Sequence, residues 1–281
     1  MKKRITRSIA ALGLIAGLTL AVTAQASPTY TYTATSTTST GAAVFTSSPS
    51  GDPVSVTSAT GAYVNGSSAT SKWTVNSVVG ASTGSSALVL YTPGGGLNYG
   101  LGMSSDGNAA PNHALDNNGN VEGVLLNFSA SVALTNINLG YVSNGSASNT
   151  PNAIVGVSLF RWTGSNPPPS LNGETATTAG MGSWQLVGNY ADGYGGNASD
   201  AIGESSSWWL VSAYDANFGT AQETNSTAAT LAGTVSDSYF KLFSVSASAA
   251  TTSKTPEPGS MALAGIALVG AAWTRRRSRK A

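Results

Sequence analysis

The most concentrated group of side chains that could do chemistry lies between residues 106 and 122. Asp116, Asn118 and Asn120 alternate along the chain, and Glu122 follows at the same spacing. Carboxylate and amide oxygens in such a pattern can surround Ca²⁺, which takes six to eight hard oxygen ligands. We therefore consider these four residues a candidate calcium site.

The same segment departs from the calcium loop of an EF-hand. Counted from Asp116, the sixth position is Val121 rather than Gly, and the twelfth is Asn127 rather than Glu. The alternative is a hairpin loop rich in Asx turns that leads into a strand at Val121. A second polar loop, 192–200, allows the same two interpretations. Calcium binding and a purely structural turn stay open as hypotheses for both loops.

Catalytic chemistry has few candidate residues. His113 is the only histidine and hence the only imidazole that could act as a base near neutral pH. Ser is abundant and Asp106 and Asp116 are near it, but no Gly-x-Ser-x-Gly elbow follows a strand and precedes a helix. A glycosidase needs two carboxylates placed across a sugar, and no spacing of the acidic residues picks out a pair. We expect no catalytic residue, with a secreted hydrolase as a second alternative function.

Two adjacent tryptophans offer a different kind of site. Trp208 and Trp209 lie in a run that favours a strand, so their side chains point to opposite faces. One is expected in the core, and the other is expected under a loop or exposed, where it could stack on a sugar ring. An exopolysaccharide-binding module is therefore the first alternative function.

Charge and cysteine content exclude several classes of protein. The chain has 281 residues, of which 9% are charged. Between residues 27 and 254, eleven acidic residues outnumber four basic ones, which gives a net charge of −7. This excludes most nucleic-acid binding, because phosphates require Lys and Arg, and it argues against acidic substrates. The absence of Cys excludes disulfides, thiolate metal sites and cysteine nucleophiles.

Short β-favouring runs separated by turn residues must position these side chains. Such runs, several with period-two alternation, predict strands at 73–79, 87–91, 121–128, 132–142, 154–162, 184–190, 208–214 and 239–245. Eight or more short strands with turn signals between them indicate an all-β fold, namely an antiparallel β-sandwich or jelly roll.

The domain boundaries follow from composition. Residues 27–60 are rich in Ser and Thr, and we expect a first strand at Tyr30 to Thr35 followed by irregular chain. Residues 61–250 are assigned to the β-sandwich domain. Residues 251–259 form a polar, proline-containing linker.

The N-terminal segment, 1–26, has the three parts of a secretory signal peptide. A basic start precedes an uncharged apolar run from Ile9 to Val22, and Ala24-Gln25-Ala26 supplies the small-x-small cleavage pattern. We expect signal peptidase to cleave after Ala26, so that the mature protein leaves the cytoplasm.

The C-terminal segment also combines apolar and basic residues. Pro256, Glu257 and Pro258 precede an uncharged apolar run from 261 to 273, and a cluster of bases follows. We expect residues 260–281 to form a single hydrophobic helix with a basic tail. Its apolar part spans about 20 Å, which is short for a hydrocarbon core of about 30 Å. The basic tail is expected to stay cytoplasmic, so the helix tethers the exported domain to the membrane.

A proline–glutamate–proline triplet, a short apolar helix and a terminal Arg cluster together resemble the PEP-CTERM sorting signal. Carried over by position, Pro256, Glu257 and Pro258 match the recognition triplet, and Arg275, Arg276 and Arg277 match the basic stop. The resemblance implies an exosortase, a membrane-embedded cysteine protease, as partner. It also implies a Gram-negative bacterium that makes extracellular polysaccharide, with the protein first tethered and then displayed or released.

The segments 111–117, 124–128, 158–162 and 184–190 are also similar to ectodomains of exosortase-dependent surface proteins. That similarity implies a β-rich surface domain. Taken together, the sequence predicts an exported, non-catalytic surface protein with a structural or adhesive role in a matrix or biofilm.

Overall fold

The computed structural model describes residues 28–37, 43–76, 88–91, 100–103, 105, 113–145, 153–165, 171–177, 181–193, 204–219 and 238–250. These residues form twelve strands and one 3-10 turn: β1 (Thr29–Thr37), β2 (Ala43–Ser48), β3 (Val56–Val64), β4 (Trp73–Asn76), β5 (Val89–Tyr91), β6 (Gly100–Gly102), β7 (Leu115–Asp116), β8 (Val121–Ser143), β9 (Ile154–Trp162), β10 (Trp184–Gly193), β11 (Ser206–Ala213), η1 (Ala216–Phe218) and β12 (Tyr239–Ala249). The described part contains no α-helix, and the predicted all-β class is confirmed.

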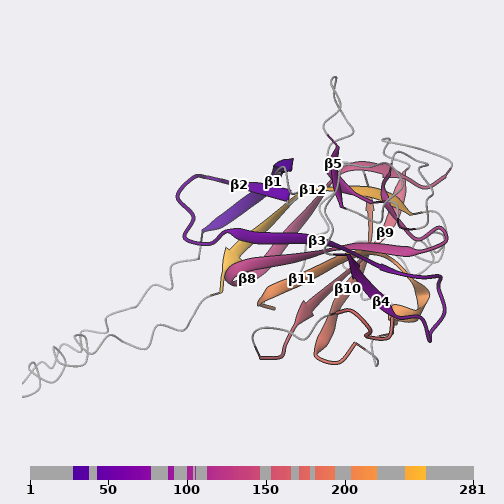
Figure 1. Ribbon diagram of the computed structural model, residues 1–281. Coiled ribbons are helices and arrows are strands. Elements are labelled where there is room, and N and C mark those ends of the chain that lie inside the picture. The colour runs from indigo at the N-terminus through magenta and orange to yellow at the C-terminus, as the bar shows by residue number, and fades with distance from the viewer. Residues whose placement is uncertain are drawn as a thin grey trace, which may run out of the picture.

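All twelve strands belong to one hydrogen-bonded antiparallel sheet (Figure 1). Its main path runs β10-β9-β11-β8-β12-β1-β2, while β3 and β4 branch from β8, and β5, β6 and β7 branch from β12. Most neighbours in this order are distant in sequence, so the fold depends on long-range pairing.

The long strand β8 connects two parts of the sheet. Residues 121–128 pair with β3 on one side and β11 on the other. Residues 132–143 pair with β12. Between them, Ser129, Ala130 and Ser131 are exposed, yet the strand continues through them. The sequence predicts two strands here, because this small polar triplet resembles a turn; long-range pairing on both sides keeps it extended.

The two parts of the sheet share one hydrophobic core. The ring of Tyr32 on β1 meets that of Phe128 on β8 edge-to-face, with centroids 5.3 Å apart. Gly61 on β3 lies close to Met103 and Leu88, so a methyl group at this position would lie 3.3 Å from Met103 Cε. The core thus holds together strands that do not hydrogen-bond to each other.

A second group of buried side chains covers the opposite face of β9 and β11. Trp73 stacks on Phe218 of η1 with centroids 5.9 Å apart, and Phe218 meets Phe160 edge-to-face at 5.1 Å. Asp215 caps η1 by accepting the backbone N–H of Asn217 at 2.7 Å. This cover explains why the central strands are buried on both faces and lack a simple in–out alternation.

The N-terminal region differs from the prediction. The irregular chain expected after the first strand contains β2, and the boundary expected between residues 60 and 61 falls inside β3. Both strands mix strand-favouring Val, Thr and aromatic residues with Ser, Ala or Gly, which weaken the strand signal. Pairing with β1 and β8 decides their conformation.

The first and last strands lie side by side. β1 pairs with β12 in antiparallel register, with Thr29 opposite Ser248. The described chain therefore begins and ends at the same end of the sheet, here named the terminal end; the end where β12 begins and β8 finishes is the far end. No helix in the described ranges is long and apolar enough to cross a bilayer. The segments predicted to be a signal peptide (1–26) and a C-terminal hydrophobic helix (260–281) lie outside the described residues, and both stay predictions.

Candidate functional site

The candidate calcium residues lie at the far end and divide into two pairs. Asp116 on β7 lies opposite Tyr239 on β12. Its Oδ1 accepts the backbone N–H of Asn118 at 2.9 Å, which is the hydrogen bond of an Asx turn. The Asn118 side chain donates to the hydroxyl of Tyr239 at 2.6 Å. This pair therefore connects the turn to β12.

The second pair meets at Ser105. Asn120 donates to the Ser105 hydroxyl at 2.7 Å, and Glu122 accepts the backbone N–H of Ser105. Glu122 is 1% exposed. Both side chains thus hold the same segment against the start of β8.

The neighbours and hydrogen bonds of these four residues are relevant to metal binding. Within the part of the chain that the structure describes, no three His, Cys, Asp or Glu side chains form a group able to hold a metal ion. The polar atoms of Asn118 and Asn120 lie against Tyr239 and Ser105, as expected for the turn interpretation. Calcium binding at these four residues stays a prediction. Most of the second candidate loop, 194–200, lies outside the described residues.

A buried cation lies near this cluster. Lys241 on β12 is 1% exposed, and its Nζ lies 4.0 Å from the ring centroid of Tyr91 and 5.2 Å from that of Tyr141. Both contacts are cation–π interactions, which replace part of the lost hydration. Burial lowers the pKa of Lys241 to about 8. The amino-acid sequence carries no signal for this burial, because a single basic residue in a strand normally has its charge in solvent.

His113 belongs to the same group. Its ring stacks on Tyr91 with centroids 5.4 Å apart and an interplanar angle of 15°. Burial lowers the pKa of His113, and the positive charge of Lys241 lowers it further. Among the described residues, no hydrogen bond joins His113 to a Ser or Asp side chain, and Asp106 lies outside them. The geometry here is that of a packed aromatic group.

The two adjacent tryptophans have different environments. Trp209 is fully buried and donates its indole N–H to the backbone oxygen of Ser206 at 3.0 Å. Trp208 is partly exposed and packs against the core. Only Trp208 therefore presents surface to a ligand, and sugar stacking by it stays a prediction.

An open cavity of about 290 Å³ lies near these tryptophans, at the terminal end. Its lining consists of Ser131, Arg161, Trp162, Thr163, Gly164, Ser205, Ser206 and Ser207. The backbone oxygen of Ser131 accepts the N–H of Ala250, the last described residue, at 3.2 Å. The cavity thus lies beside the point where the chain leaves the sheet.

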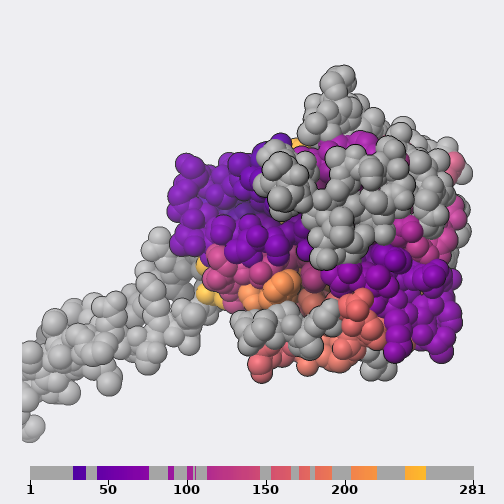
Figure 2. Space-filling view, viewed as in Figure 1, coloured from indigo at the N-terminus to yellow at the C-terminus, as the bar shows by residue number. Residues whose placement is uncertain are grey.

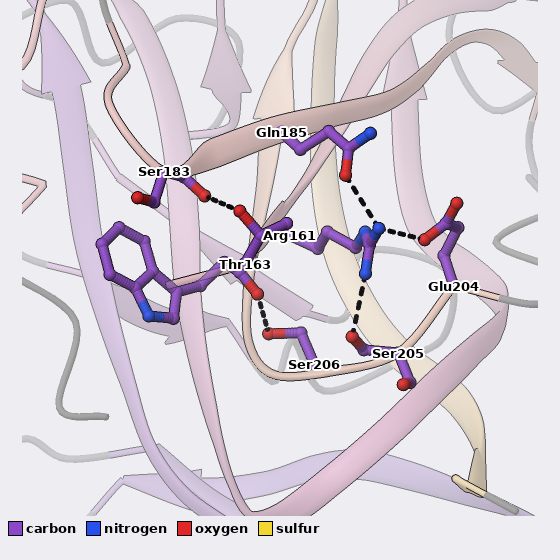
Figure 3. Close-up of polar contacts among 8 residues, drawn as sticks. Arg161, Thr163, Ser183, Gln185, Glu204, Ser205 and Ser206 are labelled. Atoms are coloured by element: carbon purple, nitrogen blue, oxygen red, sulfur yellow. Dashed lines mark hydrogen bonds and ion pairs between the residues drawn. The ribbon is translucent and has the colours of Figure 1, made fainter. Parts of the chain in front are cut away.

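Arg161 organises this cavity (Figure 3). Its guanidinium forms an ion pair with Glu204, donates to Gln185 Oε1 at 2.8 Å and donates to the backbone oxygen of Ser205 at 3.2 Å. These contacts join β9, β10 and the segment that precedes β11. The sequence signal for this site is that Arg161 is the only Arg between residues 8 and 274.

The lining of the cavity contains no exposed aromatic ring on which a sugar could stack. Trp162 is 6% exposed, and the Gly164 backbone lies so close to it that a Cβ there would be 2.3 Å from Trp162 Cζ2. The Thr163 and Ser206 hydroxyls donate to the backbone oxygens of Ser183 and Trp162 at 2.7 and 2.8 Å. These two hydroxyls of the lining thus bond to backbone oxygens, which suits a cluster that supports the loop structure.

The predicted sorting residues Pro256, Glu257, Pro258, Arg275, Arg276 and Arg277 lie outside the described residues, and comparison with known families provides the evidence on them. Residues 254–277 match the family model for the PEP-CTERM protein-sorting motif. No curated protein and no solved structure matches the chain. The motif marks an exported protein that is anchored in the membrane and processed by an exosortase, a membrane protease. The chain thus carries a PEP-CTERM sorting signal, near its C-terminus, behind an all-β domain.

Proposed function

We propose that this chain is a surface protein whose β-domain has a non-catalytic, structural or adhesive role in the extracellular matrix. The observation that supports the proposal is the pairing of β1 with β12, the last strand before the sorting motif in the sequence. Thr29 opposes Ser248, so the mature N-terminus and the segment that leads to residues 254–277 leave the sheet at the same end. A domain held in this way presents its far end away from the membrane.

We also infer that the sheet folds over itself as a sandwich, with the jelly roll as the closest description. The edge-to-face contact of Tyr32 and Phe128 supports this, because it joins residues from the two parts of the sheet that β8 connects. Such a fold buries strand faces without a disulfide, which suits a structural domain.

The surface of the domain is consistent with exposure to the extracellular environment. Val44 is the one large hydrophobic side chain that is exposed among the described residues. The excess of acidic residues between 27 and 254 keeps separate copies soluble through mutual repulsion. Adhesion then has to use polar groups or strand edges rather than an apolar patch.

The sorting step is tested by replacing the recognition triplet in the native cell. The variant P256A/E257Q/P258A removes the fixed backbone and the carboxylate from the motif. We expect it to stay membrane-bound at the mass of the unprocessed chain, whereas the natural protein is found outside the membrane fraction at a lower mass. Intact-mass spectrometry of membrane and extracellular fractions measures both states.

The prolines at 167–169 provide a matched control within the same chain. The variant P167A/P168A/P169A should be processed like the natural protein. Equal processing of the triplet variant would contradict sorting through residues 254–277. The natural protein should also be retained in extracellular matrix that has been washed free of cells. If it is processed correctly but not retained there, only the proposed matrix role is contradicted.

A further inference from the structure

The outward face of β8, β12, β1 and β2 carries small hydroxyl and amide side chains in regular rows. One row runs across all four strands through Asn136, Ser246, Thr31 and Ser48, which are direct cross-strand partners. Thr31 Oγ1 and Ser246 Oγ are 2.9 Å apart and hydrogen-bonded. We name this set and the next row the hydroxyl face.

The second row lies two residues further along each strand. It consists of Asn138, Ser244, Thr33 and Thr46. Apart from Ser244, which is 3% exposed, the members of both rows are partly or fully exposed. Neighbouring strands are about 4.8 Å apart and two residues along a strand span about 6.7 Å, so the rows form a two-dimensional grid of polar groups.

The opposite side of the same strands fixes the orientation of this grid. Tyr32, Val245 and Ile137 alternate with the row residues and are 2%, 0% and 1% exposed. Because they are locked in the core, the hydroxyl face cannot turn inward without a shift of register. The grid is thus held rigid before any ligand arrives. In the space-filling view, the segment with β1 and β2 forms the indigo surface at the left of the molecule (Figure 2).

The hydroxyl face contains no charge. The parts of the four strands that carry the two rows lie within residues 28–51, 129–145 and 242–250, which include no Asp, Glu, Lys or Arg, although the domain as a whole carries a net charge of −7. Glu122 on β8 and Lys241 on β12 lie outside these parts, and both are buried. An anionic polymer would be repelled by the domain and would find no cation on this face. The chemistry that fits is a neutral ligand with many hydroxyl groups.

The ligand must also be extended and ordered. Each hydroxyl has one donor and two acceptor positions, so the bonded pair Thr31–Ser246 keeps one donor and three acceptors for a partner. A single hydrogen bond formed in exchange for water contributes only about 0.5–1.5 kcal/mol. Affinity therefore needs many contacts at once, and a rigid repeating ligand loses less entropy in making them than a flexible one.

We propose that the hydroxyl face binds an ordered, neutral polysaccharide. The proposal deepens, and rests on, the proposed function of a displayed matrix domain. It places carbohydrate recognition on Thr, Ser and Asn of four strands rather than on Trp208 or the Arg161 cavity.

The test is co-sedimentation of the mature exported protein with microcrystalline cellulose, with calcium alginate beads as the anionic comparison. We expect retention on cellulose that is unchanged between 50 and 500 mM NaCl, because no charge takes part. Retention on alginate should be absent. Salt-sensitive binding or preference for alginate would overturn the proposal.

Variants localise the binding. T31V/S246A removes the bonded hydroxyl pair, and T46V/S48A removes exposed hydroxyls of β2, where little else depends on them. Each should lower retention on cellulose at least fivefold. T57V changes an exposed strand threonine on β3, outside the face, and should have no effect. Thermal melts followed by circular dichroism identify a variant that fails to fold. If T31V/S246A does not fold, the retention of T46V/S48A on cellulose tests the proposal.

Two outcomes would reject the inference while leaving the proposed function intact. One is failure of the natural protein to bind cellulose although it is sorted and retained in the matrix. The other is concentration-dependent dimerisation, measured by sedimentation velocity, that T31V/S246A abolishes, since the face would then bind a second copy of the chain.

Discussion

At the residue scale, the ammonium group of Lys241 is buried, and burying a charge costs free energy. Among the described residues no carboxylate forms an ion pair with this group, and the two tyrosine rings offset only part of the cost of burying the charge. Neighbouring groups are also shifted: burial lowers the pKa of His113, the Lys241 charge lowers it further, and burial alone raises the pKa of Tyr91. This cluster makes the stability of the domain depend on pH.

The pH dependence has a defined sign. The pKa of Lys241 falls from 10.5 to about 8 in the folded protein. Between these values the unfolded chain binds more protons, so the free energy of unfolding rises with pH, by at most about 1.4 kcal/mol per pH unit. Urea denaturation between pH 7 and 9.5 should show this rise, because tyrosines, with an ordinary pKa of about 10, are still mostly protonated at the upper limit.

Lys241→Met should remove the effect, because the apolar side chain does not titrate. We expect it to be more stable than the natural protein at pH 7, with the difference shrinking toward pH 9.5. Lys72→Met, at an exposed position, is the matched control and should keep the natural profile. A Lys241→Met variant that retains the rise would show that another group causes it.

At the element scale, β8 determines how the strands are assembled. It pairs with β3 and β11 through its first half and with β12 through its second, whereas β10 pairs only with β9 among the described strands. Side chains of β8 are therefore confined on both sides, and those of β10 lie at an open edge. The same substitution should have different consequences in the two strands.

Leu126 on β8 and Leu186 on β10 allow a matched comparison. Leu126 is fully buried and Leu186 only partly buried. We expect Leu126→Ala to lower the free energy of unfolding by about 3–5 kcal/mol, since the cavity cannot collapse between paired strands. Leu186→Ala should lower the free energy of unfolding by less than about 2 kcal/mol, because solvent can enter and the edge strand can relax into the space. Equal losses in thermal and urea denaturation would refute the central role of β8.

At the scale of the whole molecule, the two ends of the sheet have different surroundings. β12 is eleven residues long, so the ends are about 35 Å apart. The terminal end holds the chain exits and the Arg161 cavity, and the far end holds the buried polar groups around Asp116, Glu122 and Lys241. Attachment at one end makes these two regions unequally accessible on a cell.

Epitope tags can measure this difference. Gly145 follows β8 at the far end, and Gly51 lies between β2 and β3 at the terminal end; both are exposed, with φ values of 75° and 95°. In cells that lack the exosortase, a tag at Gly145 should bind antibody several-fold better than a tag at Gly51. If the two tags label equally on tethered protein, the proposed orientation is contradicted. Released protein is the control, because both of its tags should label equally.

Features that depend on contiguous segments could be predicted from the order of the amino acids alone. The sorting motif at 254–277 and strands such as 154–162 and 184–190 could be predicted because their signals are local. Strands β2 and β3 were missed because their composition is weak and their pairing is distant. The clustering of Tyr91, His113 and Lys241, and the rows of hydroxyl groups across four strands, bring together residues up to about two hundred positions apart. Only tertiary structure decides these contacts, because the energy that fixes strand register comes from burial of the opposite face and not from the polar residues themselves.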